Sequence, residues 1–264
     1  MKRSEFLAAA GALSILPLAG MSAGTGSKAS EPNQFIELIH YQLHVGPKQR
    51  LVADFYKDIA IPALNKLGIK NVGVFSMVYG SNGPSLYVII PHASLEAVYS
   101  DNENLLKDKD FLLAGDKFLN APLNNAPFVK MEKSILRTFN NLPQLMVPEN
   151  LMKNDSRIYE IRTYESHSLL AAKRKIQMFN EGGEIDIFKK TGLQPVMFAE
   201  TIAGPQMPNL QYMLVFENMT DRDKKWDVFR DSPEWDKLKS DPFYADTVSC
   251  ITDVILKPAQ FSQI

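Results

Sequence analysis

Hydrophobic and polar residues alternate along the stretch RIYEIRTYESH, at residues 157–167, in the way that is typical of a β-strand. Side chains of a strand point alternately to its two faces, so Tyr159 and Ile161 share one face. The other face carries Glu160, Arg162 and Tyr164. A row with a carboxylate, a guanidinium and a phenol is either solvated or directed into a polar cavity.

The same pattern occurs earlier in the chain. FIELIHY, at residues 35–41, matches IYEIRTY, at residues 158–164, with Glu37 against Glu160 and Tyr41 against Tyr164. Four further blocks match in the same order, and the offset stays between about 120 and 125 residues. Chance similarity between strands would not preserve this spacing, so the sequence predicts a tandem duplication.

Each half contains the same series of expected elements. The first half reads as a strand at 34–43, a helix at 48–67, strands at 71–80 and 85–91, helical material at 94–119 and a strand at 128–138. The second half reads as a strand at 157–165, a helix at 168–191, strands at 194–203 and 210–217, helical material at 221–239 and a strand at 247–257.

Local signals support these boundaries. Gly68 and Gly192 follow the first helix of each half, where a left-handed C-cap favours glycine. Ser232 followed by Pro233 is typical of a helix start. We therefore expect a divergent N-terminal unit at 34–139, a linker at 140–156 and a C-terminal unit at 157–264.

The order β-α-β-β-α-β predicts a ferredoxin-like unit, in which both helices cover one face of a four-stranded antiparallel sheet. Two such units can bury their open faces by packing sheet to sheet, so we expect an α+β fold, an intrachain dimeric α/β-barrel. The more apolar strand positions, such as Ile36, Leu38, Tyr159 and Ile161, are then expected to meet the helices. The polar rows around Glu37 and Glu160 are expected to lie between the sheets.

The first 30 residues resemble a signal peptide rather than part of the fold. Lys2 and Arg3 precede an apolar run and a tail of small residues. The run is too short to span a bilayer, so we expect an exported protein, periplasmic or secreted, without a membrane span after signal removal. Lys2-Arg3 also resembles a twin-arginine signal with one arginine replaced, which leaves the export route open.

Composition excludes several classes of function. The chain has 264 residues and a net charge of −1, without the basic excess that nucleic-acid binding requires. Its one cysteine, Cys250, is expected to be a small buried strand residue. No His/Cys cluster has metal-binding spacing, and no Walker loop, G-x-S-x-G elbow or dinucleotide fingerprint is present. Neither a metal nor a cofactor is expected.

The second half resembles the NIPSNAP family, which belongs to the dimeric α/β-barrel group. The resemblance rests on Tyr159-Glu160-Ile161-Arg162-Thr163-Tyr164 and on the helical stretch with Trp226, Phe229 and Trp235. The first half departs from it, with Ile39 in place of Arg162 and no tryptophan in its second helical region. The resemblance implies the barrel fold; related barrels include monooxygenases, haem-handling proteins and binding modules, so no reaction is implied.

The candidate ligand-binding residues are those of the two polar rows: Glu160, Arg162, Tyr164, Glu37 and Tyr41. Alternatively, Glu160 and Arg162 form a structural ion pair, and the tyrosines fill the interface. Trp226 and Trp235 are expected to pack in the core, and His92 and His167 to be solvated.

Two functions of different class remain open. One is an exported binding module for a small molecule or a protein partner, with a homo-oligomer as a further option. The other is a cofactor-independent enzyme, similar to a monooxygenase or an isomerase, that acts on a small organic substrate between the sheets. A sealed, apolar space between the sheets would favour the binding module, and an open cavity of a few hundred cubic ångströms there would favour the enzyme.

Overall fold

The computed structural model describes residues 31–264, which form one unit. The expected signal segment at residues 1–30 lies outside the described residues. The strands are β1 (Phe35–Gln42), β2 (Gly73–Tyr79), β3 (Ser85–His92), β4 (Lys130–Thr138), β5 (Ile158–Glu165), β6 (Gln194–Ala203), β7 (Asn209–Phe216) and β8 (Cys250–Pro258).

The helices pair up in sequence order. They are α1 (Leu51–Phe55), α2 (Ile61–Lys66), α3 (Leu95–Lys107), α4 (Lys109–Leu119), α5 (Leu169–Asn180), α6 (Glu184–Lys190), α7 (Met219–Arg230) and α8 (Pro233–Lys239). A π-helical turn at Tyr56–Ala60 joins α1 to α2. Gly68 and Gly192 end α2 and α6 with φ of 85° each, as a left-handed cap requires.

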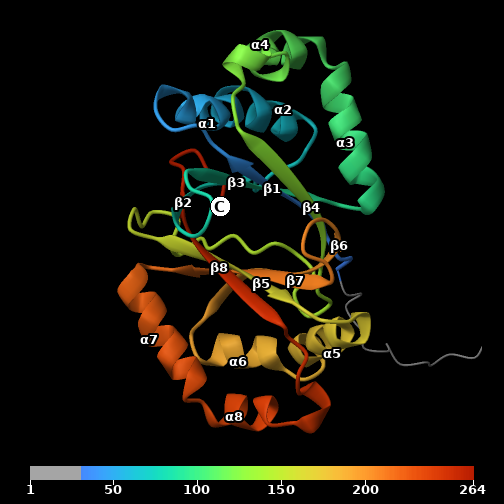
Figure 1. Cartoon of the computed structure of the whole chain (residues 1–264), viewed down its shortest axis with the longest axis vertical. Coiled ribbons are helices and arrows are strands. Elements are labelled where there is room, and N and C mark those ends of the chain that lie inside the picture. Colours follow the sequence, from blue (N-terminus) through green and yellow to red (C-terminus); the bar gives the residue numbers. More distant parts are fainter. Residues whose placement is uncertain (1–30) are drawn as a thin grey trace, which may run out of the picture. The chain divides into compact units, whose positions relative to one another are not determined.

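The eight strands close into an antiparallel barrel in the order β1-β3-β2-β8-β5-β7-β6-β4. Within each half the order is that of a ferredoxin-like sheet, and the halves join where β2 pairs with β8 and where β4 pairs with β6. The helices of the two halves lie on opposite sides of the barrel (Figure 1). The expected α+β fold with two ferredoxin-like units is confirmed.

The expected orientation of the strand faces is wrong. Ile36, Leu38, Tyr159 and Ile161 belong to the apolar cluster inside the barrel, whereas the rows around Glu37 and Glu160 lie under the helices. Both faces of these strands are buried, so alternation alone could not decide between them. The helix-covered face suits the two glutamates because Asn102 of α3, and Arg222 and Trp226 of α7, donate hydrogen bonds to them there.

One end of the barrel is closed by the segments that follow the last strand of each half. Leu145 and Leu151, from the expected linker, and the C-terminal Ile264 belong to the barrel cluster. The backbone N–H of Met146 donates to Val196, and that of Gln263 donates to Val72. Both acceptors lie at strand starts, which places these segments at one end and leaves the other end open.

Candidate functional site

A cavity of about 330 Å³ lies between the sheet and the helices of the first half. Its walls are mainly apolar side chains of the helices and of the segment around the start of β4, namely Phe55, Ala60, Leu64, Leu105, Leu106, Phe111, Phe118, Leu119, Phe128 and Met131. Leu106, Leu119 and Met131 are also exposed to solvent, which marks the entrance. A mainly apolar cavity with few polar groups is typical of a small-molecule site.

Glu37 is the charged group at the polar end of this cavity. It is 1% exposed, and Oε1 contacts the Lys133 ammonium while Oε2 accepts hydrogen bonds from His92 Nε2 (3.3 Å) and Asn102 Nδ2 (3.2 Å). Burial raises the pKa of Glu37, but the bonds from His92 and Lys133 outweigh burial and hold it below its usual value. The carboxylate is therefore ionised at neutral pH.

His92 connects Glu37 to the outside of the molecule. Its Nδ1 lies 2.8 Å from Asp101 Oδ2, and its Nε2 faces Glu37. Burial lowers the pKa of His92, but hydrogen bonds to the two carboxylates outweigh burial and raise it above its usual value. His92 and Asp101 also line an outer cleft of about 630 Å³, so this chain of three groups separates the cleft from the cavity.

Two tyrosines form another part of the cavity wall. The hydroxyl groups of Tyr41 and Tyr56 lie 3.1 Å apart, and burial raises the pKa of both. Tyr41 also packs against Phe128. Both phenols therefore stay protonated and bind each other within an aromatic wall. Among the sequence candidates, Glu37 and Tyr41 line this cavity together.

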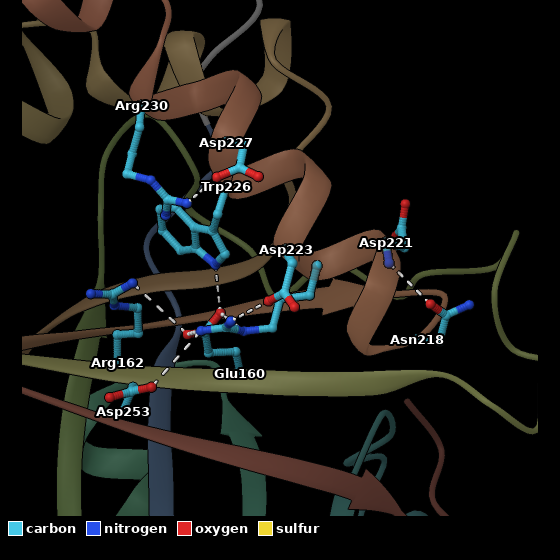
Figure 2. Close-up of polar contacts among 10 residues, drawn as sticks. Glu160, Arg162, Asn218, Asp221, Asp223, Trp226, Asp227, Arg230 and Asp253 are labelled. Atoms are coloured by element: carbon cyan, nitrogen blue, oxygen red, sulfur yellow. Dashed lines mark hydrogen bonds and ion pairs between the residues drawn. The ribbon is translucent and has the colours of Figure 1, made fainter.

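In the second half, Glu160 is held by residues of α7. It is 0% exposed, and Arg222 donates to both oxygens, from Nη2 to Oε1 (2.5 Å) and from Nε to Oε2 (3.1 Å). The indole of Trp226 reaches down from α7 and donates to Oε2 (2.8 Å), as Figure 2 shows. The strand pattern does not predict Arg222 as a partner of Glu160, because Arg222 lies on α7 and not on the strand row.

Arg162 is a weaker partner of Glu160 than expected. Its Nη1 lies 3.9 Å from Glu160 Oε1, and its guanidinium lies over the ring of Trp226 at 4.7 Å (Figure 2). The Tyr164 hydroxyl accepts a hydrogen bond from that of Tyr212 (3.0 Å). A ligand-binding role for Glu160, Arg162 and Tyr164 stays a prediction.

The helix caps and the glycines that end α2 and α6 define corresponding positions in the two halves. Ser94 caps α3 and Asn218 caps α7, so Asn102 corresponds to Trp226, eight residues after the cap. Both side chains donate to the buried glutamate of their half. Counting back from Gly68 and Gly192 pairs two further cavity residues with larger groups, Ala60 with Glu184 and Leu64 with Phe188.

These differences explain why a cavity lies in the first half. The corresponding space in the second half is filled by packed aromatic rings, with Phe188 5.8 Å from Trp226 and 4.7 Å from Phe229 between ring centres. Glu184 adds a buried ion pair, its Oε2 lying 2.8 Å from Lys175 Nζ. Burial raises the pKa of Glu184 despite that lysine.

Other residue expectations had mixed outcomes. Trp226 is buried and His167 is exposed, as expected. His92 was expected in solvent, but it is only 3% exposed because Glu37 and Asp101 bind both ring nitrogens. Cys250 was expected to be buried, but it lies exposed at the first position of β8.

Within residues 31–264, there is no group of three His, Cys, Asp or Glu side chains that could hold a metal ion. No helix in the same range has the length and apolar character needed to cross a membrane.

Comparison with known proteins agrees with the fold. Residues 159–263 match the NIPSNAP family model, which confirms the resemblance for the second half. A proposed monooxygenase from Lactobacillus acidophilus NCFM has a TM-score of 0.53 at 10% identity, over 86% of this chain and 94% of that chain. An anthrone oxidase-like protein has a TM-score of 0.52 at 8% identity, over 87% and 93%. These two likenesses show the fold alone.

A smaller relative matches less of the chain. A NIPSNAP family protein of unknown function from Agrobacterium tumefaciens strain C58 is 26% identical, over 41% of this chain and 93% of that chain, with a TM-score of 0.35. No curated protein sequence is significantly similar to the chain.

Proposed function

We propose that this protein, which carries a NIPSNAP domain at residues 159–263, binds a small and largely apolar molecule in the cavity of its first half. The observation that supports the proposal most directly is the difference in size between Asn102 and Trp226, which occupy corresponding positions. Where the second half fills the space with an indole, the first half has a small amide that keeps the bond to the glutamate and leaves the space open.

The chemistry of the cavity defines the ligand class. Aromatic and aliphatic walls favour a flat apolar body, because apolar surface gains most from leaving water. Glu37 is ionised. His92 and Asn102 donate to its Oε2, whereas Lys133 contacts its Oε1, so Oε1 can accept a second hydrogen bond from a ligand. The ligand is therefore an aromatic molecule with a hydroxyl group that donates to Glu37.

Titration of the full chain with 2-naphthol, followed by the fluorescence of the naphthol, tests this proposal. We expect saturable binding to the unaltered chain. Asn102→Trp places in the cavity the side chain that fills the other half, and should weaken binding about tenfold or more, or about 1.4 kcal/mol. Leu123→Trp is the matched control, since Leu123 is 95% exposed in the same half, and it should leave binding unchanged.

Two results would contradict the proposal. One is the absence of saturable 2-naphthol binding. The other is binding that Asn102→Trp leaves unchanged while circular dichroism shows that the variant is folded. Glu37→Gln gives a second test: it keeps the size of the side chain but removes the negative charge, and it should weaken 2-naphthol more than naphthalene, which has no hydroxyl group.

A second function, proton abstraction from a bound substrate, is favoured by one observation. Glu37 faces the cavity, and His92 and Asp101 link it to the outer cleft. A carboxylate that takes a proton at the buried end of a cavity filled by substrate needs such a route to return the proton to water. The resemblance to an anthrone oxidase-like protein suggests anthrone as a test substrate.

The oxidation of anthrone can be written without a cofactor. A base removes a proton from the central carbon, the carbanion reacts with O₂, and loss of water gives anthraquinone, so that anthrone and O₂ yield anthraquinone and water. We expect oxygen uptake to be lost in Glu37→Gln and slowed in Asp101→Asn. Oxygen uptake that is the same with and without the protein would exclude this function while leaving ligand binding intact.

Export remains a proposal that rests on the order of charged, apolar and small residues in positions 1–30. N-terminal sequencing of protein recovered from outside the cytoplasm should begin after residue 20. Recovery of the full-length chain from the cytoplasm alone would contradict it.

A further inference from the structure

The open end of the barrel carries a second cavity, separate from the one under the helices. Its volume is about 340 Å³. It lies at the end opposite to Leu145 and Ile264, where β1 and β5 finish and β4 and β8 begin. We call it the barrel mouth. The register of β1 with β3 and β4, and of β5 with β7 and β8, is continuous here and defines the neighbours of the strand residues in the lining.

Two rows of polar residues face each other across the barrel mouth. In the first half, His40 on β1 lies between Tyr87 on β3 and Glu132 on β4. In the second half, Thr163 on β5 lies between Gln211 on β7 and Thr252 on β8. One position deeper on each face, Leu38, Ile161 and Val254 form an apolar floor.

The charges in the barrel mouth are already balanced. Glu132 contacts the Lys130 ammonium, and its Oε2 lies 3.7 Å from His40 Nδ1. The Ser85 hydroxyl donates to the Asn82 carbonyl (2.6 Å), so it accepts from His40 Nε2 (2.9 Å). Burial lowers the pKa of His40 below its usual value despite Glu132, so the ring is neutral. A charged ligand would find no uncompensated partner here.

The remaining polar groups can both donate and accept. Tyr87, Thr163 and Thr252 line the barrel mouth, and each carries a hydroxyl that can donate and accept a hydrogen bond. Gln211 donates through Nε2 to Thr201 Oγ1 (3.3 Å), which leaves its oxygen available. Burial raises the pKa of Tyr87 to about 12, so its hydroxyl stays a donor. Its ring stacks on His40, with centres 4.5 Å apart, and forms a flat wall.

We propose that the barrel mouth binds a small uncharged polyol of about the size of a monosaccharide. Such a molecule matches the arrangement because it carries several hydroxyls that donate and accept, together with C–H faces that can pack on the apolar floor and on an aromatic wall. The volume lies at the lower end of the range of small-molecule sites, which suits a single ring. The proposal is independent of the cavity under the helices.

A titration of the ¹⁵N-labelled full chain with D-glucose, D-galactose and myo-inositol, followed by amide chemical shifts, tests the proposal. We expect saturable shifts around Thr163 and Gln211 for at least one of the three. Tyr87→Phe removes one donor with little change in packing and should weaken binding about threefold to tenfold. Thr163→Trp fills the barrel mouth and should abolish it, whereas Thr220→Trp, at an exposed position of α7, should not change it.

Three outcomes would overturn the proposal. The first is the absence of saturable shifts with all three compounds. The second is saturable shifts that persist in both Tyr87→Phe and Thr163→Trp. The third is tighter binding of acetate or ethylammonium than of any of the three polyols, since that would show a charge-selective site. Amide spectra of the variants show directly whether each one is folded.

Discussion

At the scale of single residues, Glu37 and Glu160 have the same place in the fold and different partners. Each accepts a hydrogen bond from the side chain eight residues after a helix cap, Asn102 or Trp226. The cation of Glu160 comes from the helix, as Arg222, whereas that of Glu37 comes from the neighbouring strand, as Lys133. In both halves the buried carboxylate therefore keeps its hydrogen bonds, although the side chain beside it is small in the first half and large in the second.

The bidentate pair predicts a large loss of stability when Arg222 is removed. Arg222→Ala leaves the buried carboxylate of Glu160 with Trp226 and a distant Arg162, which should lower the free energy of unfolding by about 3 kcal/mol. Urea denaturation measures this loss. Glu160→Gln in the same chain should recover part of it, because the stranded charge is then absent.

Arg162→Ala is the matched comparison, because Arg162 lies on the same strand as Glu160. It removes a cation that stacks on Trp226 and only approaches Glu160, so the expected loss is about 1–2 kcal/mol. A loss from Arg162→Ala larger than that from Arg222→Ala would show that the strand arginine, and not the helix arginine, holds the carboxylate.

The raised pKa of His92 predicts how the free energy of unfolding depends on pH. Its pKa in the folded state lies above the ordinary 6.5 because Glu37 and Asp101 bind the ring, although burial acts in the opposite direction. The folded protein therefore holds a proton that the unfolded chain releases. This contribution is complete below pH 6.5 and is lost as pH rises through the raised pKa.

Urea denaturation at several pH values between about 6 and 9 measures this effect. The free energy of unfolding should fall with rising pH, and His92→Gln should remove most of that slope. Glu37 acts in the opposite direction, because its lowered pKa contributes stability above 4.5 that is lost as pH falls. An equal slope in His92→Gln would mean that other groups carry the dependence.

At the scale of elements, α3 and α7 show how the space between sheet and helices can hold a cavity in one half and packed side chains in the other. Both helices begin at a side-chain cap, and their eighth residues point at the sheet of their own half. In α7 that residue is Trp226, within the ring packing of Phe188 and Phe229. In α3 it is Asn102, beside the cavity.

Exchange of these two residue types should have unequal effects on stability. Trp226→Asn leaves a void among well-packed rings and should lower the free energy of unfolding by about 3–5 kcal/mol. Asn102→Trp fills existing space and keeps an N–H for Glu37, so it should change stability by less than about 1.5 kcal/mol. Thermal or urea denaturation measures both, and equal losses would show that the cavity of the first half cannot accept an indole.

The elements were predictable from the sequence, but the site was only partly so. Strands and helices follow from alternation, from the glycines that end α2 and α6, and from Ser232, whose hydroxyl accepts from the Trp235 N–H. Alignment of the caps at Ser94 and Asn218 would have indicated that Asn102 faces the buried Glu37. The cavity exists because Ala60, Leu64 and Asn102 together have less side-chain volume than the corresponding residues of the second half. No single residue indicates it.

At the scale of the whole molecule, the barrel interior joins the two halves. The cluster inside it includes Ile36, Phe75 and Leu136 from the first half, and Tyr159 and Met213 from the second. The strand pairs β2–β8 and β4–β6 add backbone hydrogen bonds between the halves. Each half alone would expose an apolar sheet face, so its stability depends on the other half.

This dependence predicts that residues 31–264 unfold in one cooperative step, and the tryptophans allow a direct test. Both tryptophans of the chain lie in the second half, so their fluorescence reports on that half, whereas far-ultraviolet circular dichroism reports on both. Phe75→Ala, in the first half, removes a ring that packs 4.8 Å from that of Tyr159, and should cost about 3 kcal/mol or more.

If the halves unfold together, Phe75→Ala shifts the fluorescence transition in urea as far as the dichroism transition. A control within the first half separates local from shared effects. Phe111 packs against Phe55 under the helices rather than inside the barrel, so Phe111→Ala acts on a local cluster. In a cooperative unit, it too must shift the tryptophan signal. If Phe111→Ala shifts only the dichroism transition, the first half can unfold by itself, and the shared interior is then too weak to couple the two halves.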